Sequence, residues 1–378
     1  MRSLVWTLLA TSSAFMSSAL GANPHHTAEY TAPSSSPRRE IPLNEGWRFL
    51  QASDPANAMA SEFDDAQWEK VSLPHTWNRV GLYEDAAKVG VHRPAMINKL
   101  QGPGWYRVSL TPPRLLSGQR AWLEFDAASR TAEVWLNGIK LGSHAGGFSR
   151  FRFDATNVLR VGAPNILVVK TDNSPPRAGS LTANTFPLMG DFFVHGGLYR
   201  PARLIVTEAT HFDMLDHGSP GVYARTTRIA DGQANVAVIA KLSTSDRRMQ
   251  RVSVHASLIH PDGTISSRAS TTTNIKPGIA IDAGLSLDLA NPHLWHGTKD
   301  PFLYRLVVEL RDSKGKLLDR YDRPFGVREI RLDPQKGFFL NGENIRLFGV
   351  GLHQDREGMG WDTVIPQTIR ASLPRNAR

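Results

Sequence analysis

The 378-residue sequence contains no cysteine. A disulfide framework, a thiolate nucleophile and a cysteine-ligated metal are therefore excluded. The sequence also lacks any clustered run of positive charge. Its formal net charge is +9, but lysine and arginine are spread through strand-like segments beside aspartate and glutamate. We therefore expect no nucleic-acid partner.

No apolar run reaches the roughly 20 residues that cross a bilayer, so no membrane partner is expected. The N-terminus does carry an apolar stretch, Leu4–Ala10, after the basic residue Arg2 and before small residues around Ala19. This pattern is typical of a secretory signal peptide over residues 1–21, which predicts a periplasmic or secreted protein. The alternative is an N-terminus without regular structure. A proline- and serine-rich linker is expected over residues 22–39.

A helical period of 3.6 residues is also missing, because no such pattern persists for more than a turn or two. Short alternating runs take its place. Within Ala121–Asp126, alanine, leucine and phenylalanine alternate with tryptophan, glutamate and aspartate, which predicts a half-buried strand. Asn137-Gly138 predicts a two-residue hairpin turn, because both residues tolerate positive φ. The pattern over residues 40–210 predicts an all-β fold with a β-sandwich.

The same pattern continues over residues 211–328. Strands are predicted at 235–242, 252–260 and 302–311, and Pro261-Asp-Gly263 predicts a turn. Roughly 110 residues with about seven short strands indicate an immunoglobulin-like β-sandwich. We expect this domain to act as a spacer, since no cluster of its polar residues suggests a site.

A series of short motifs runs through residues 43–361. Those of the two predicted sandwiches are Leu43-Asn-Glu-Gly-Trp-Arg-Phe49, Val71-Ser-Leu-Pro-His-Thr-Trp-Asn78, Gly104-Trp-Tyr-Arg107, Val134-Trp-Leu-Asn-Gly138, His144-Ala-Gly-Gly-Phe148, Gly196-Gly-Leu-Tyr-Arg-Pro201 and Asn291-Pro-His-Leu-Trp295. By this series the chain resembles glycoside hydrolase family 2, the group of β-galactosidases, β-glucuronidases and β-mannosidases. The resemblance implies a jelly-roll-like sugar-binding sandwich, an immunoglobulin-like sandwich and a catalytic TIM barrel.

Three features of the first domain allow both a structural and a ligand-binding interpretation. In Leu73-Pro-His-Thr-Trp77 we expect Pro74 to fix a turn and Trp77 to pack at the sandwich edge, although histidine and tryptophan also stack on sugars. His144 is expected to be a hydrogen-bonded loop histidine. Arg200 is expected to make a buried pairing beneath the loop.

Asp191 is the sharpest candidate site residue. It lies nine residues before Arg200, where the resemblance to β-galactosidases implies an aspartate that contacts a galactosyl hydroxyl and a monovalent cation. A carboxylate suits both roles, because it accepts directed hydrogen bonds and ligates hard cations. The alternative is an aspartate that caps the turn after Met189-Gly190. Within the family, the Gly190-Asp191-Phe192 block favours a β-galactosidase.

Residues 329–361 resemble the entry into the catalytic barrel. Gly349-Val-Gly-Leu-His-Gln-Asp355 is similar to the family pattern Gly-Val-Asn-x-His-Glu. The resemblance implies that His353 donates hydrogen bonds to sugar hydroxyls at the active-site face of the barrel. Gly351 and Gln354 depart from the asparagine and glutamate of the family, so the hydrogen bonds around this histidine are expected to differ.

The catalytic carboxylates of the family are not recognised in this sequence. A retaining glycosidase needs an acid and a nucleophile about 5 Å apart; the family places them on later barrel strands, and a TIM barrel needs roughly 250 residues. Glu329, Glu343 and Glu357 do not stand in the Asn-Glu context of the family's acid/base, so no catalytic residue is assigned. We expect residues 362–378 to be an off-pattern tail from a truncated or frameshifted reading frame, and this chain alone to be inactive.

The expected function is that of a β-galactosidase-type glycosidase that hydrolyses terminal β-O-glycosidic bonds, with a carbohydrate as partner. β-Glucuronidase and β-mannosidase are alternatives. A carbohydrate-binding β-sandwich protein without a barrel is another, as is a subunit that completes a barrel-bearing partner. We expect no cofactor in these residues; the resemblance implies magnesium and sodium in the family's full-length enzyme, and it allows a homo-oligomer.

Overall fold

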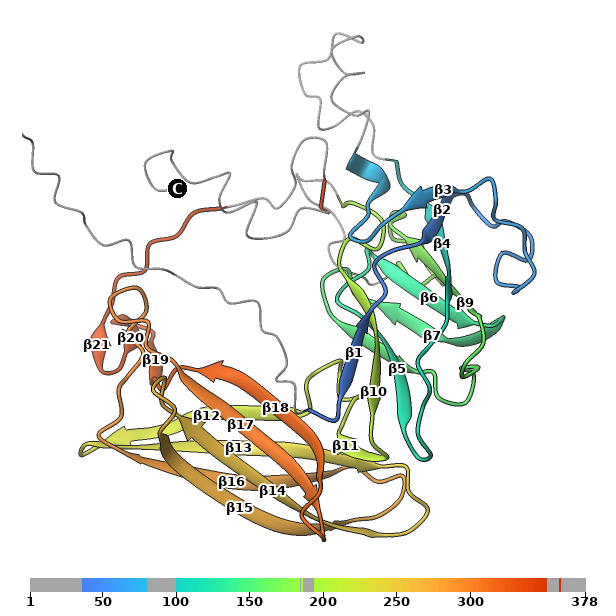
Figure 1. The fold of residues 1–378 in the computed structure, drawn as a ribbon. Helices are drawn as coiled ribbons and strands as arrows, with labels where there is room; N and C mark the ends of the chain where they lie inside the picture. Colours follow the sequence, from blue (N-terminus) through green and yellow to red (C-terminus); the bar gives the residue numbers. More distant parts are fainter. Residues whose placement is uncertain (1–35, 80–99, 184, 186–193, 352–359, 362–378) are drawn as a thin grey trace, which may run out of the picture. The chain divides into compact units, whose positions relative to one another are not determined.

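The structure is a computed structural model that describes residues 36–79, 100–183, 185, 194–351 and 360–361. These residues all belong to the compact unit Ser34–Arg378. The predicted signal peptide, Asp191, His353 and the predicted tail lie outside them. The described part of the chain is all-β, as expected, with 21 strands and the short 3-10 turn η1 (Trp77–Arg79) (Figure 1). It contains no helix with the length and hydrophobicity of a transmembrane span.

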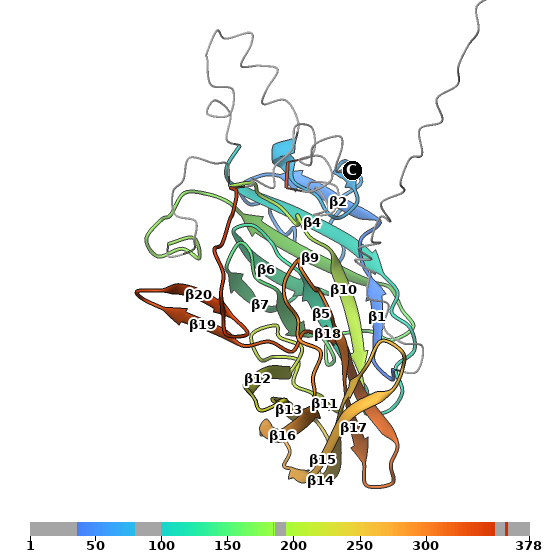
Figure 2. The same ribbon diagram turned by 90° about the vertical axis from the view of Figure 1, so that its left-hand side faces the viewer.

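Two antiparallel sheets form the first sandwich (Figures 1 and 2). One has the order β1-β10-β5-β8, with β1 (Arg39–Pro42), β10 (Ala202–Thr207), β5 (Arg120–Phe125) and β8 (Phe151–Asp154). The other has the order β3-β2-β4-β9-β6-β7, with β3 (Glu69–Val71), β2 (Trp47–Gln51), β4 (Pro103–Leu110), β9 (Asn165–Asp172), β6 (Thr131–Leu136) and β7 (Ile139–Ala145). Their core includes the fully buried Trp47, Tyr106, Leu123, Val134 and Leu204.

Strand β5 differs from the sequence prediction, because it is buried on both faces instead of one. On the face expected to be exposed, Trp122 is only 4% exposed and packs with Met214. Glu124 is equally buried, and its carboxylate forms ion pairs with Arg152 and Arg203. Since a buried charge is tolerated only when it is paired, these arginines allow a glutamate at this position. Residues that follow much later in the chain cover this face, which an alternating pattern cannot reveal.

The predicted hairpin turns are confirmed. Asn137 and Gly138 connect β6 to β7 with φ values of 52° and 79°. Gly263, with φ 92°, lies in the turn between β14 and β15. An L-residue other than asparagine or aspartate adopts such a conformation only with strain, so these turns fix the register of both hairpins.

A second sandwich follows, again of two antiparallel sheets. One contains β13 (Gln233–Thr244), which pairs with β11 (Thr210–Phe212), β12 (Val222–Ala230) and β16 (Ile281–Ala290). The other has the order β15-β14-β17-β18, with β15 (Ile265–Ile275), β14 (Gln250–Ile259), β17 (Tyr304–Asp312) and β18 (Leu317–Phe325). Burial alternates along β13 and β16, so one face of that sheet supplies the core. The seven longer strands, β12–β18, agree with the number expected from the sequence.

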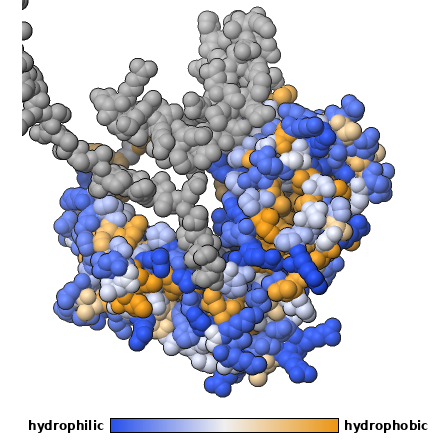
Figure 3. All heavy atoms as spheres, in the orientation of Figure 1, coloured by the Kyte–Doolittle hydropathy of each residue, from blue (hydrophilic) through white to orange (hydrophobic). Residues whose placement is uncertain are grey.

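The surface is mainly hydrophilic on the face drawn in Figure 3, with hydrophobic residues in patches between polar ones. Tyr223 in β12 and Ile239 in β13 are cross-strand neighbours and are both 42% exposed. Exposed apolar residues in small groups are normal on a soluble sheet.

A small third sheet follows the second sandwich. Its order is β19-β20-β21, with β19 (Ile330–Asp333), β20 (Gly337–Leu340) and β21 (Glu343–Asn344). Asn341 and Gly342 make the predicted turn with φ values of 52° and 82°. After β21, Phe348 and Val350 are 83% and 93% exposed.

Asp319 in β18 connects the beginnings of both sandwiches. Its fully buried carboxylate accepts hydrogen bonds from Arg38 Nη2 and Nε, at 2.7 and 3.1 Å. It also accepts the backbone N–H groups of Phe212 and Arg320, each at 2.9 Å. Because Arg38 directly precedes β1 and Phe212 ends β11, one carboxylate links the entry of the first sandwich to the second.

We predict that Asp319→Ala lowers the free energy of unfolding by about 3 kcal/mol or more, because it leaves the Arg38 guanidinium, whose side chain is only 12% exposed, and the backbone N–H of the buried Phe212 without their acceptor. Urea unfolding followed by circular dichroism measures the change. Asp282→Ala is the matched control, because Asp282 pairs with Lys241 at 3.4 Å with its side chain 58% exposed. Exposed pairs contribute little, so equal effects of the two variants would contradict the role given to Asp319.

Candidate functional site

The two predicted sugar-contacting residues, Asp191 and His353, lie outside the described residues. The described residues beside their segments can still be placed. Val194 follows the first segment and Gly360 follows the second. Both lie at the end of the first sandwich that carries the Leu73–Trp77 motif, as the contacts below show. This end is therefore the candidate site.

Trp77 is the central side chain at this end. It is 8% exposed and stacks on Phe49, with ring centroids 5.6 Å apart and an interplanar angle of 13°. Its indole N–H donates to the carbonyl of Leu100 at 3.0 Å. Gly104 and Gly196 flank the ring so closely that a Cβ atom would lie 2.5 and 1.9 Å from it. The prediction that Trp77 packs at the sandwich edge is confirmed.

His75 in the same motif is also a structural residue. It is 2% exposed, and its Nδ1 lies 2.7 Å from the hydroxyl of Tyr106. His75 and Trp77 also line a hollow of about 510 Å³, together with Phe49, Glu69 and Thr76. Their burial and packing favour the structural interpretation of the motif, while the hollow is compatible with the ligand-rim interpretation.

Two buried asparagines hold the chain beside the Asp191 segment. Asn78 Oδ1 accepts the backbone N–H of Gly196 at 2.8 Å, and its Nδ2 donates to the Leu100 carbonyl at 3.0 Å. Asn173 Nδ2 donates to the Val194 carbonyl at 2.8 Å. Their exposures are 3% and 0%, so their amides serve the backbone and not solvent. Sequence reasoning missed both as organising residues, and Asn78 was visible only as the last residue of a motif.

Arg130 fixes the start of the same region. It is 2% exposed and donates to the carbonyls of Ser174 and Thr185, each at 2.8 Å. A guanidinium can bond two separate carbonyls at once because its donors point in fixed directions. Ser174 and Thr185 are thereby fastened to the residue directly before β6, ahead of the segment that carries Asp191.

His144 is hydrogen-bonded, as expected, but it lies near the end of strand β7, opposite Ala132 of β6, and not in a loop. Its Nε2 lies 3.1 Å from both the Gly146 carbonyl and the Ser149 hydroxyl, and its ring stacks on Phe151 at 4.3 Å. Burial lowers the pKa of this imidazole, so the neutral form dominates at neutral pH. A neutral ring packed in this way stabilises the chain between β7 and β8.

Two glutamates of the described residues are engaged in other contacts. Glu124 is fully engaged with arginines in the interior, as described above. Glu343 lies on β21, where its carboxylate is 3.7 Å from Lys299 and its side chain is 60% exposed. Glu357 lies outside the described residues. Within the described ranges no group of three histidine, aspartate or glutamate side chains could hold a metal ion, and the predicted cation ligand Asp191 is not among them.

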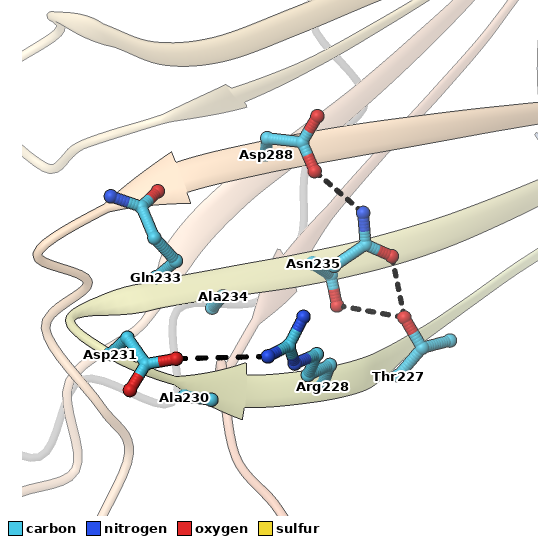
Figure 4. A pocket seen from close by; sticks show the side chains of 8 residues that line it. All are labelled: Thr227, Arg228, Ala230, Asp231, Gln233, Ala234, Asn235 and Asp288. Atoms are coloured by element: carbon cyan, nitrogen blue, oxygen red, sulfur yellow. Dashed lines mark hydrogen bonds and ion pairs between the residues drawn. The ribbon is translucent and has the colours of Figure 1, made fainter.

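A hollow of about 540 Å³ lies on the second sandwich, over β12, β13 and β16 (Figure 4). Asn235 Nδ2 donates to Asp288 Oδ1 at 2.6 Å, and Thr227 Oγ1 donates to Asn235 Oδ1 at 2.5 Å. Arg228 and Asp231 form a weak, exposed pair at 3.7 Å. Since these polar groups bond to one another and none of the eight lining residues is aromatic, the hollow is a weaker candidate for sugar binding.

Comparison with known proteins gives a consistent result for both sandwiches. A model described as the sugar binding domain of glycosyl hydrolases family 2 matches residues 41–208. A second model, described as glycosyl hydrolases family 2, matches residues 221–328. Together they cover most of the chain.

The relatives found are glycosidases. A β-glucuronidase of Bacteroides fragilis is 32% identical over 85% of this chain and 42% of its own length. A β-galactosidase of Bacteroides ovatus is 28% identical over 86% of this chain and 36% of its own. The crystal structure of a Bacteroides uniformis β-glucuronidase superposes with a TM-score of 0.78 at 30% identity, over 88% of this chain and 38% of that one. The chain thus spans less than half the length of each of these relatives.

We predict that Gly196→Ala lowers the free energy of unfolding by about 2 kcal/mol or more, because the new methyl group would overlap the Trp77 indole. Gly284→Ala in β16 is the control, since a Cβ there meets no atom within 4 Å. Thermal and urea unfolding measure both. If Trp77 is the cause, the double variant Gly196→Ala/Trp77→Phe loses less stability than the sum of the two single variants; additive losses would contradict the contact.

Proposed function

This chain belongs to glycosyl hydrolases family 2, and on that premise we propose that it forms the sugar-recognising, non-catalytic part of a β-glycosidase that hydrolyses terminal β-O-glycosidic bonds. The observation that carries the proposal is the order of two matched domains. The first sandwich corresponds to the sugar binding domain of the family, and the second follows it directly. Val194 and Gly360, the first described residues after the segments that carry Asp191 and His353, both lie at the end of the first sandwich around Trp77.

The proposed roles of these residues follow from their chemistry. Asp191 accepts hydrogen bonds from sugar hydroxyls and binds a monovalent cation, while His353 donates hydrogen bonds to the same sugar. Asn78, Asn173 and Arg130 bond to backbone groups of the described chain beside Asp191, and we assign them the task of positioning that chain. Magnesium binding by the barrel and assembly into a homo-oligomer belong to the proposal for the whole enzyme.

The sugar is proposed to be a β-galactoside or a β-glucuronoside. The Gly190-Asp191-Phe192 block favours the galactoside. Relatives that are 28–32% identical to this chain include both β-glucuronidases and a β-galactosidase. The signal-peptide pattern of residues 1–21 adds export to the periplasm or the medium to the proposal.

The acidic side chains are the reason for assigning sugar recognition to the two sandwiches and bond cleavage to a barrel. Cleavage with retention requires an acid and a nucleophile about 5 Å apart on either side of the glycosidic bond. Glu124 is paired with Arg152 and Arg203, and Glu343 lies on the surface beside Lys299. Recognition and scaffolding are therefore the tasks proposed for these residues, and bond cleavage is assigned to a barrel.

We predict that a chimera in which residues 41–328 replace the matching sandwiches of the Bacteroides uniformis β-glucuronidase hydrolyses a 4-nitrophenyl β-glucuronide or β-galactoside. The purified 378-residue chain, assayed beside it, should release no 4-nitrophenol above the uncatalysed rate. In the chimera, Asp191→Asn should lower kcat/KM by about 100-fold, because a charged acceptor of sugar hydroxyl groups is lost.

Thermal unfolding establishes that each chimera is folded before it is assayed. A folded chimera that hydrolyses neither sugar would contradict the proposal, as would turnover by the 378-residue chain at ordinary enzyme rates. The preferred sugar distinguishes the two substrate classes.

A further inference from the structure

Trp361 is buried, whereas residues 346–351 are exposed. Phe348 and Val350 are 83% and 93% exposed, whereas Trp361 is 4% exposed. An indole buries a large apolar area, and its loss of exposure requires a surface shaped to receive it. That surface belongs to the first sandwich.

Three aromatic rings surround the indole. His195 is stacked on it at 5.2 Å and 25°, and Tyr199 meets it edge-on at 5.2 Å and 60°. Phe148, from the loop after β7, is tilted against it at 5.5 Å. Ala127 completes the buried cluster, and Val194 packs against it at the rim.

The backbone around Trp361 fits the same place. The Trp361 carbonyl accepts a hydrogen bond from Arg200 Nη1 at 3.2 Å. Gly360 has a φ of 57°, and a Cβ there would lie 2.7 Å from the His195 ring and 2.8 Å from Thr76. Glycine suits this conformation and this close approach better than any other residue. The backbone of Gly360 and the indole of Trp361 therefore both fit this surface of the first sandwich.

Tyr199 is a rigid part of this surface. Its hydroxyl donates to the Gly147 carbonyl, and burial raises the pKa of the phenol to about 12. The phenol therefore stays neutral throughout the physiological range. Gly147 directly precedes Phe148, so this bond also ties the Phe148 loop to Tyr199.

We propose that Phe148, His195 and Tyr199 form a docking site on the first sandwich for Trp361, and that this contact fastens the predicted barrel entry to the sugar-binding domain. The functional part rests on the proposed function. In the sequence, Asp191 precedes His195 by four residues and His353 precedes Trp361 by eight. The stacked rings of His195 and Trp361 thus join the described residues that follow these two segments in the sequence, and Trp361 acts as a positioning residue there.

Hydrogen exchange of the full 378-residue chain tests the docking. In Trp361→Ala, the peptide that covers residues 194–200 should exchange at least about tenfold faster than in the wild type, because the segment opens locally once the indole is gone. Trp361→Phe keeps an aromatic ring and should restore most of the protection. Phe348→Ala is the matched control, since it removes an exposed ring from the same part of the chain and should exchange like the wild type.

Fluorescence provides a second measurement that does not depend on a destabilised variant. The difference between the wild-type and Trp361→Phe emission spectra isolates Trp361. We expect a blue-shifted component that acrylamide quenches poorly, as for a buried indole. Wild-type exchange rates in Trp361→Ala, or a difference spectrum typical of an indole in water, would overturn the proposal. Neither measurement uses a sugar, so their outcome is independent of the test of glycosidase function.

Discussion

The indole of Trp77 fills the space that Gly104 and Gly196 leave open, and the candidate site depends on this contact. A side chain of any other residue at either glycine would overlap the ring. With the indole in place, its N–H reaches the Leu100 carbonyl, and Gly196 comes within hydrogen-bonding distance of Asn78. The Trp77 indole, packed between two glycines, therefore sets the relative positions of the chain around residues 77, 104 and 196.

Buried polar side chains then make this arrangement specific. Asn78 accepts the N–H of the buried Gly196, and Asn173 donates to the Val194 carbonyl. Buried backbone groups are costly to leave without a hydrogen bond. The same principle operates on the outer face of β5, where the Glu124 carboxylate is paired with Arg152 and Arg203. It operates again at Asp319, which links the entry of the first sandwich to the second. The apolar cores form the two sandwiches, and these polar contacts define how particular segments are fastened to them.

Local signals in the sequence predicted much of the fold. Asn137-Gly138 and Asn341-Gly342 produce the expected turns because the need for positive φ is a property of the turn itself. Alternation also identified strands such as β13 and β14, since it reflects a sheet with one buried face. It failed for β5, where Trp122 and Glu124 are covered by residues from elsewhere in the chain.

The candidate site was less predictable, for the same physical reason. The hydrogen bond from Gly196 to Asn78 spans 118 residues, and no local pattern indicates such a partner. The docking of Trp361 on His195 and Tyr199 is equally long-range. Motifs that resemble a known family did identify Trp77 and its surroundings. The roles of Asp191 and His353, the sugar preference and the export signal stay predictions, because those residues lie outside the described part of the chain.

Binding of a terminal sugar to the end of the first sandwich is the central claim, and titration of the 378-residue chain with methyl β-D-galactoside and methyl β-D-glucuronide tests it most directly. Saturation-transfer NMR should detect a Kd in the millimolar range for one of them, equivalent to about −4 kcal/mol. Asp191→Asn should abolish the signal, whereas Asn235→Ala, in the hollow of the second sandwich, should leave it unchanged. No binding of either sugar, or binding that is lost in Asn235→Ala and kept in Asp191→Asn, would contradict the account.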